Sequence, residues 1–462
     1  MKPKYDILYR RRFFPLFITQ FFGAFNDNLM RNGLVTLITF KIISAEALGA
    51  DPKILATIAA VLLIAPYIFF SGLAGELADK YERASLMRYT KCFEIFVMLI
   101  AGYGFYTNNV HLLMGLLFAA GLQATFFSPM KYSVLPDFLH KDELITGNGF
   151  IEGGTFLAIL LGSILGTQFG NLIDLNNPQT SLYISVSLVV ISALGIISSL
   201  FIPRAGAASP ELKVNPNVLA STGEVLRIVH GNPPVFYAIM GTSWFWGIGS
   251  VFMSQFPAFG REVLFATPDV YTVFLATFSI GVAVGSVTCA KVLQGEITAK
   301  YAPYALVGIT VCTLLMLAAT HFAVLPAADV IAKDHQLHQG LLKGAEVAAA
   351  REYVAAHLFS SREFFSHIAN LCILVGIFGI SFFGGIYTVP LKAIIQTKAE
   401  EKSRSRVVGG DNIYNSIFMV AAGIGVSALL AAHVSVNGIF LAVAMLNLGY
   451  ALFIKQIVKK IG

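Results

Sequence analysis

The sequence predicts an all-α membrane protein with twelve transmembrane helices in two six-helix halves. Three observations lead to this prediction: a composition too apolar for a soluble chain, twelve apolar segments of spanning length, and one short motif that occurs twice. Of the 462 residues, 56% are hydrophobic and 13% are charged, and the mean hydropathy is +0.72. Soluble globular proteins carry about 25% charged residues. The composition therefore excludes a soluble enzyme, a disordered protein and a nucleic-acid-binding protein.

The apolar segments follow one another along the whole chain. A spanning helix needs about 20 predominantly apolar residues. The first segment follows a basic N-terminus and has no small-residue cleavage site, so we expect a spanning helix and not a removable signal peptide. The predicted spans are residues 13–42, 54–74, 89–107, 110–130, 148–170, 180–202, 235–259, 270–293, 302–324, 366–390, 411–432 and 434–456.

The basic residues are unevenly distributed between the two sets of connecting segments. The segments on the side of both termini hold 23 of the 32 Lys and Arg residues, the opposite segments hold six, and three lie within predicted spans. Loops rich in Lys and Arg stay in the cytoplasm. The distribution predicts a multi-pass protein with both termini in the cytoplasm.

The chain divides near its middle. We expect an N-terminal half at residues 1–202, a cytoplasmic linker at 203–234 and a C-terminal half at 235–462, with an outer-face insertion at about 327–365 that contains one or two surface helices. The motif Gly75–Tyr81 recurs at Gly295–Tyr301, 220 residues later, with four of seven positions identical. Duplicated halves are a recurrent transporter architecture, with the substrate path between them.

Glycine ridges on two predicted helices favour close helix packing. Gly162, Gly166 and Gly170 recur every four residues on the fifth predicted helix, and Gly281 and Gly285 form a shorter ridge on the eighth. Small residues at this spacing let the backbones of two membrane helices approach. We expect both ridges to be structural.

The first predicted helix carries two charges deep in the membrane. Asp27 lies about 21 Å along the helix from Phe13, and Arg31 follows it by one turn on the same face. An unpaired charge at this depth costs at least about 2.5 kcal/mol. The two residues either neutralise each other as an internal ion pair or form a polar site on a central path. Intramembrane charges favour the second alternative.

Other polar residues occur near the ends of the third, fourth and fifth predicted helices. Lys91 and Glu94 either anchor the helix at the membrane interface or form part of a site. The same two alternatives hold for Lys131. The spans of the second half carry almost no charge. This asymmetry suits an amphiphile whose head contacts the first half and whose tail contacts helix 7. The predicted substrate contacts are Asp27, Asn28, Arg31, Lys131, Asn148, Glu152, Trp244 and Phe252.

The segment Gly75-x-Leu77-Ala78-Asp79-Lys80-x-x-Arg83 resembles the signature of the major facilitator superfamily between helices 2 and 3. Glu82 stands where that signature prefers glycine. The resemblance implies a conformational gate of Asp79, Lys80 and Arg83, which holds the two halves together on the cytoplasmic side.

Four stretches together resemble the bacterial lysophospholipid transporter family of that superfamily: Phe21–Asn28, Ser128–Leu135, Asn148–Gly166 and Val389–Gln396. The resemblance implies flippase-like transport of lysophosphatidylethanolamine and lysophosphatidylglycerol across the bacterial inner membrane, for re-acylation inside. It also implies polar contacts at Asp27, Lys131 and Glu152. The family pattern includes a basic residue on helix 7, and this chain has none there.

The resemblance implies lysophospholipid and membrane lipids as partners, and an acyltransferase and acyl-activating enzyme on a separate chain. No HxxxxD acyltransferase motif and no GxxxxGK[ST] loop for ATP occurs in the sequence, so we expect no enzymatic activity and no cofactor. His335 and His338 have a spacing compatible with a metal, but a solvated helix face is the favoured reading. The alternative function is a proton- or sodium-coupled carrier of another small amphiphile or drug, with Asp27 or Glu152 as the coupling carboxylate.

Overall fold

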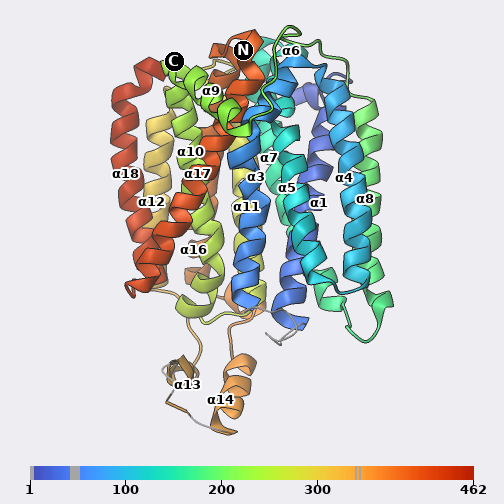
Figure 1. The fold of residues 1–462 in the computed structure, drawn as a ribbon. Helices are drawn as coiled ribbons and strands as arrows, with labels where there is room; N and C mark the ends of the chain where they lie inside the picture. The colour runs from blue at the N-terminus through green and yellow to red at the C-terminus, as the bar shows by residue number, and fades with distance from the viewer. Residues whose placement is uncertain (1–4, 42–51, 339–340, 343–344, 462) are drawn as a thin grey trace.

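The structure is a computed structural model and describes residues 5–41, 52–338, 341–342 and 345–461. In this part of the chain, twelve long helices stand side by side in one bundle (Figure 1). Each matches one predicted span, and residue 42, the predicted end of the first, lies outside the described residues. The helices are α1 (Phe14–Thr36), α3 (Pro52–Lys80), α4 (Arg83–Tyr106), α5 (Val110–Ser133), α7 (Leu144–Leu172), α8 (Leu182–Leu200), α10 (Pro233–Ala258), α11 (Pro268–Leu293), α12 (Ala302–Thr320), α16 (Ile368–Lys398), α17 (Arg404–Ala431) and α18 (Val436–Ile461).

Ten of these helices are long and apolar enough to cross a membrane. The two that fail this criterion within the described residues are α1 and α4, which carry Asp27 and Arg31, and Lys91 and Glu94. Both helices nevertheless pack along their length, α1 against α7 and α4 against α8. The prediction of an all-α, multi-pass membrane protein is therefore confirmed, and the least apolar helices are those with buried charge.

Helix α1 begins and α18 ends at the same end of the bundle, which we call the terminal end (Figure 1). From the opposite, far end project α13 (Ala328–His338) and α14 (Ala345–Ala356), the surface helices expected in the insertion. The short α15 (Ser361–Ser366) returns the chain to α16. Backbone hydrogen bonds between Phe359 and both Phe265 and Thr267 tie the insertion to the segment before α11.

The linker contains a helix that the sequence analysis did not identify. Helix α9 (Val218–His230) is capped by the Asn217 side chain, which accepts hydrogen bonds from the amides of Leu219 and Ala220. It packs on α3, where a Cβ at Gly72 would lie 2.8 Å from the backbone nitrogen of Thr222. The linker is thus held against the first half at the terminal end.

Both glycine ridges bring helices into close contact, as predicted. On α7, a Cβ at Gly166 would lie 2.5 Å from the carbonyl oxygen of Leu29 on α1. On α11, Gly281 and Gly285 face the backbone of α16 at Phe378 and Phe382, with no room for a side chain. These approaches fix α1 against α7 in the first half and α11 against α16 in the second.

Helices α16 and α17 extend well beyond their predicted spans. The predicted span stopped at Pro390, but α16 continues through it to Lys398, and α17 begins at Arg404, not at residue 411. The extension of α16 places Lys392 inside the bundle, where it forms an ion pair with Asp411, the first residue of the predicted span 411–432; the two side chains are 4% and 1% exposed. The expectation of a nearly uncharged second half is therefore wrong. Proline is tolerated inside membrane helices, so it was a poor end marker here.

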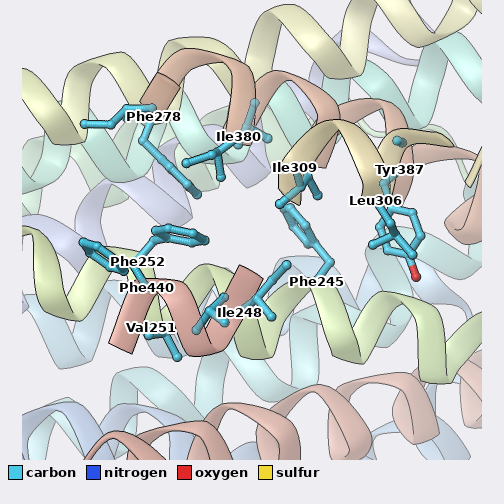
Figure 2. Close-up of a cluster of buried hydrophobic side chains, with 14 of the residues drawn as sticks. Phe245, Ile248, Val251, Phe252, Phe278, Leu306, Ile309, Ile380, Tyr387 and Phe440 are labelled. Carbon is cyan, nitrogen blue, oxygen red and sulfur yellow. The ribbon is translucent and has the colours of Figure 1, made fainter. Parts of the chain in front are cut away.

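The core of the second half is rich in aromatic and branched side chains. Figure 2 shows Phe252 of α10, Phe278 of α11 and Phe440 of α18 converging from different helices, with Ile248 and Ile380 nearby. The rings of Phe252 and Phe440 are stacked with centroids 5.1 Å apart. This packing fixes the orientation of α10 toward the first half.

Candidate functional site

Helix α1 carries Asp27 and Arg31 one turn apart, near side chains of α3, α4 and α11. Both side chains are half-buried. They do not form an ion pair with each other, which is one of the two alternatives predicted from the sequence. One carboxylate oxygen of Asp27, Oδ1, is buried and has no hydrogen-bond partner among the described residues. Asp27 interacts electrostatically with Tyr67 of α3, and Arg31 with Tyr271 of α11. Arg31 thus has a neighbour in the second half, whereas the neighbours of Asp27 belong to the first.

Lys91 and Glu94 form a buried ion pair behind Asp27. Their charged atoms are 2.6 Å apart, and each side chain is 1% exposed, so they are not an interfacial anchor. The Lys91 ammonium lies against α1 at Gly23, where a Cβ would lie 2.7 Å from Nζ. It also lies 5.1 Å from the ring centroid of Phe127. Asp27 interacts electrostatically with both members of the pair.

A second charged group lies between the halves and is named here the two-lysine cluster. It consists of Lys131, Tyr132, Glu152, Lys392 and Asp411. The Tyr132 hydroxyl donates a hydrogen bond to Glu152 Oε1 at 2.7 Å. The ring of Tyr132 has the ammonium nitrogens of Lys131 and Lys392 at 4.4 and 4.7 Å from its centroid. One lysine comes from each half.

Hydrogen bonds from the second half complete this cluster. Lys392 forms an ion pair with Asp411, and the Thr242 hydroxyl of α10 donates to Asp411 Oδ1 at 2.5 Å. Lys131 is half-buried and forms no ion pair with any described residue. Glu152 accepts a hydrogen bond from Tyr132 at Oε1, although the sequence around Glu152 offers no polar partner. Its second carboxylate oxygen, Oε2, is buried and has no hydrogen-bond partner in the described part of the chain.

Two predicted contacts serve helix packing. The side chain of Asn148 exchanges two hydrogen bonds with Gln396 of α16, at 2.8 and 2.9 Å, and both residues are buried. Asn28 donates to the carbonyl of Ala24 on its own helix and lies against Gly162. The first pair joins the two halves, and the second supports the contact between α1 and α7.

The two predicted tail contacts on α10 face away from the first half. Trp244 donates from Nε1 to Asn447 of α18 at 2.9 Å and stacks on Tyr450 at 4.5 Å. Phe252 is fully buried in the aromatic core (Figure 2). An apolar helix gives no indication of which face meets a partner, so the sequence could not select between its aromatic residues.

Other aromatic residues of α10 do contact the first half. The ring of Phe156 on α7 stacks on Trp246 with centroids 5.8 Å apart. It also lies 6.3 Å from Phe245 and 6.2 Å from Phe278 of α11. These four rings form an apolar contact between the halves.

The predicted gate residues lie at the terminal end. The buried carboxylate of Asp79 accepts hydrogen bonds from the amides of Ser405 and Arg406 at 2.9 and 3.2 Å, and from Arg406 Nε at 3.1 Å. It thereby caps the N-terminus of α17, where the helix dipole favours a negative charge. Asp79 connects the first half directly to the second.

Arg83 and Lys80 make different contacts from Asp79. Arg83 forms an ion pair with Asp137 of the short helix α6 (Leu135–Phe138), within its own half, and Asp137 in turn accepts from Arg404 at 3.0 Å. Lys80 lies 5.5 Å from the ring centroid of Tyr81 and makes no contact across the halves among the described residues.

The side-chain hydrogen bonds and ion pairs that join the two halves lie in the part of the bundle nearest to the terminal end. Besides the gate, they connect Ser133 with Ser405 at 2.9 Å and Ser128 with Asn412 at 3.1 Å. These contacts between the halves close the structure at the terminal end.

The described residues contain no group of three or more His, Cys, Asp and Glu side chains placed to hold a metal ion.

Tyr132, Lys392 and Asp411 are not among the residues predicted from the sequence. Two of them lie beside or within stretches that carry a signal: Tyr132 follows Lys131, and Lys392 lies within the apolar Val389–Gln396. A lysine surrounded by aliphatic residues indicates a buried position when the apolar pattern continues past it. That continuation could have identified Lys392.

Comparisons with known proteins agree on the family and the fold. The family described as Major Facilitator Superfamily matches residues 16–332. The lysophospholipid transporter LplT of Pectobacterium carotovorum is 26% identical over 299 residues, which cover 64% of this chain and 68% of that protein. LplT of Citrobacter koseri is 26% identical over 310 residues, covering 67% and 72%.

Solved structures match the fold over nearly the whole chain. The human organic anion transporter MFSD10 (TETRAN) has a TM-score of 0.66 at 10% identity, covering 97% of this chain and 100% of that chain. The transporter FucP in its outward conformation has a TM-score of 0.63 at 10% identity, covering 97% and 99%.

Proposed function

The chain belongs to the Major Facilitator Superfamily, and on that premise we propose that it transports lysophospholipids across the bacterial inner membrane by alternating access. The family consists of transporters, so the chain is a multi-pass transporter and not an enzyme. The proposed substrates are lysophosphatidylethanolamine and lysophosphatidylglycerol. The observation that carries the proposal is the pairing of half-buried charges on α1 with an aromatic contact surface on α10. The similarity to LplT supports the same substrate class.

The headgroup is assigned to the charged residues of the first half. A lysophosphatidylethanolamine head carries an ammonium group, for which Asp27 offers the complementary charge, and Arg31, one helical turn away, gates the head. Asp27 has a carboxylate oxygen without a hydrogen-bond partner in the described chain, so it can accept from a substrate without breaking an existing bond. Hydrogen bonds to charged groups contribute more than neutral ones.

The acyl tail is assigned to the aromatic residues between the halves and to the bilayer beside them. Moving a tail of about sixteen carbons through water would cost roughly 0.8 kcal/mol per CH₂, on the order of 12 kcal/mol. A lateral opening between the halves avoids this cost, because the tail stays in apolar surroundings. Phe156 and Trp246, one from each half, lie where such an opening would expose them.

The proposed orientation puts the terminal end in the cytoplasm, because 23 Lys and Arg residues lie on that side against six on the other. The closed terminal end then corresponds to a state that receives substrate from the outer side. Lysophospholipid delivered inside would be re-acylated by an acyltransferase and an acyl-activating enzyme on a separate chain.

The test is transport by the full-length protein in proteoliposomes. We expect uptake of radiolabelled lysophosphatidylethanolamine and none of a sugar or a cationic drug. The Asp174→Asn variant, which changes an exposed loop residue, serves as the matched control for Asp27→Asn and should transport normally. Uptake of the sugar or the drug, with none of the lysolipid, would overturn the proposal.

A proton- or sodium-coupled carrier of another small amphiphile is the second candidate. The observation that favours it is the pair of buried carboxylate oxygens without partners in the described residues, Asp27 Oδ1 and Glu152 Oε2. Such groups are positioned to bind and release a cation during the cycle. Transport that stops when the proton and sodium gradients are collapsed would favour this candidate.

A further inference from the structure

We propose that Lys131 and Lys392 form a binding site for one phosphate group, with one lysine from each half and Tyr132 as the platform between them. This inference rests on the proposed function where it identifies the phosphate as the phosphodiester of a lysophospholipid. The placement of the two lysines itself does not depend on that function.

The geometry brings two cations to one ring. Both ammonium nitrogens lie within 4.7 Å of the Tyr132 centroid, and Tyr132 is 6% exposed. The Tyr132 hydroxyl is held by Glu152 at 2.7 Å, which fixes the ring. Two positive charges repel each other in a low-dielectric interior, so an anion that contacts both ammonium groups is favoured. Lysine is a common phosphate-binding residue.

The two lysines differ in how their charge is balanced. Lys131 is half-buried and forms no ion pair with a described residue, but it interacts electrostatically with Glu152. Its ammonium can therefore take a further anionic ligand. Lys392 is buried and forms an ion pair with Asp411, whose Oδ1 accepts a hydrogen bond from Thr242 at 2.5 Å. Because a buried lysine without a partner would be costly, an incoming phosphate competes with Asp411 for Lys392.

The site exists only while the two halves are together. Lys131 and Tyr132 lie on α5, whereas Lys392 and Asp411 lie on α16 and α17. Separation of the halves at the terminal end removes Lys392 from the ring. A phosphate that touches both lysines thus binds the closed form more tightly and biases the equilibrium toward it.

The experiment measures equilibrium binding to the full-length protein in nanodiscs. Three probes are used: lysophosphatidylethanolamine, a monoacylglycerol with the same acyl chain and no phosphate, and glycerol 3-phosphate. We expect wild-type protein to bind the lysolipid about 10- to 100-fold more tightly than the monoacylglycerol. In Lys392→Ala this ratio should fall to near one, and Lys392→Arg should restore most of it.

A matched control and a charge-balanced variant accompany these measurements. Lys300 also lies over a tyrosine ring, 5.4 Å from the Tyr301 centroid, but it is exposed, so Lys300→Ala should leave the ratio unchanged. Because Lys392→Ala leaves Asp411 buried and unpaired, the double variant Lys392→Ala/Asp411→Asn is tested for the same loss. Asp411→Asn alone should tighten lysolipid binding several-fold, since it removes the competing carboxylate; a purely structural ion pair predicts no such gain.

The outcomes separate this site from the proposed function. A folded Lys392→Ala/Asp411→Asn variant that still prefers the lysolipid overturns the two-lysine site and leaves the transport proposal intact. If wild-type protein binds glycerol 3-phosphate through Lys392 and ignores the lysolipid, the site stands and the lipid function fails. If phosphate-dependent binding requires the acyl chain, the phosphate comes from the lipid headgroup.

Discussion

The two copies of the repeated motif both approach the other half of the bundle, but they differ in backbone conformation and in charge. The first copy forms the last turns of α3, where a Cβ at Gly75 would lie 2.7 Å from the Cα of Arg406 at the start of α17. After α11, a Cβ at Gly295 would lie 3.3 Å from the carbonyl of Asp142, just before α7. Each copy thus approaches the N-terminal end of a long helix in the other half. Gly295 has a φ of +80°, a left-handed conformation that favours glycine.

Two charges of the first copy recur in the second, Glu76 as Glu296 and Lys80 as Lys300, but Asp79 and Arg83 have no charged counterparts. At the 220-residue offset, Asp79 corresponds to Ala299, and Arg83 corresponds to Pro303. Asp79 caps α17 in the opposite half, whereas the buried Ala299 has only apolar contacts to offer. Both copies of the motif therefore make a close backbone contact with the other half, but only the first copy adds an ion pair to it, between Asp79 and Arg406.

The charged residues inside the membrane are also unequally divided between the two halves. Residues Asp27, Arg31, Lys91, Glu94, Lys131 and Glu152 all belong to the first half, whereas Lys392 and Asp411 are the second half's contribution near the path. The second half has an aromatic core in their place. The comparison teaches that the two halves have different tasks: one supplies charge, and the other supplies an apolar scaffold with a single ion pair.

The largest effect should come from the scaffold of the second half. Phe252→Ala removes a fully buried ring that stacks on Phe440 and should lower the free energy of unfolding by about 3–5 kcal/mol. Thermal unfolding of the purified protein measures this. Phe322→Ala, at a 76% exposed position, is the control and should change little. A stable Phe252→Ala protein that has lost only long-chain transport would mean that Phe252 lines the tail path.

Next in size is the effect of removing charge from the first half. Asp27→Asn should reduce lysophospholipid uptake about 100-fold, equivalent to about 2.7 kcal/mol, with normal insertion into the membrane. The physical reason is the loss of the half-buried carboxylate that faces the path. Asp174→Asn provides the matched control in the same uptake assay. Normal uptake by a correctly inserted Asp27→Asn variant would remove this carboxylate from the proposed site.

The sequence was sufficient for the twelve spanning helices because each span is set by a local property, its apolar length, whereas the linker helix α9 was not predicted. It also singles out Asp27, Lys131, Glu152 and Asp79 as candidates, since charge in or beside an apolar segment is visible in one dimension. It failed where the answer depends on side-chain direction. The one-turn spacing of Asp27 and Arg31 sets a common face, but their rotamers follow neighbours on other helices.

Lys392 and Trp244 illustrate the same limit from the second half. Lys392 lies two residues beyond the predicted span 366–390, in the part of α16 that packing inside the bundle sustains. Trp244 was chosen for the path because α10 is apolar on all sides, and only the contact with Asn447 and Tyr450 reveals its direction. In both cases the deciding interaction joins residues far apart in the sequence.

A smaller effect is expected at the gate. Asp79→Asn should slow transport about 10-fold and leave substrate affinity within about twofold, because the capped contact favours one state and does not touch the path. Rates and affinities from proteoliposomes separate the two quantities. Glu296→Gln, an exposed position in the loop after α11, is the control and should have no effect on either. Weakened affinity at an unchanged rate would contradict the one-sided gate.

The smallest effect concerns Glu82, the residue that stands where the family signature prefers glycine. Its carboxylate accepts hydrogen bonds from the amides of Ala84 and Ser85 at the start of α4, and from Ala205 of the linker, at 2.8 to 2.9 Å. The counterpart in the second half is Ala302, which caps nothing. Glu82 thus adds a linker contact to the charged loop.

Partial burial raises the pKa of Glu82, but the hydrogen bonds from Ser85, Ala205 and Ala84 outweigh it, so the pKa lies below the ordinary value of 4.5. A carboxylate with a lowered pKa stabilises the folded state above its ordinary value, and this contribution is lost as the pH falls through the lowered pKa. Glu82→Ala should therefore cost about 1 kcal/mol at pH 7, as for a lost helix cap. The difference in melting temperature between wild type and Glu82→Ala should shrink on acidification below pH 4.5, whereas Glu211→Ala, at an exposed linker position, should match wild type throughout. A Glu82→Ala deficit that is equally large in acid would show that Glu82 acts by packing and not by its charge, and the electrostatic advantage of the first loop would then reduce to Asp79 and Arg83.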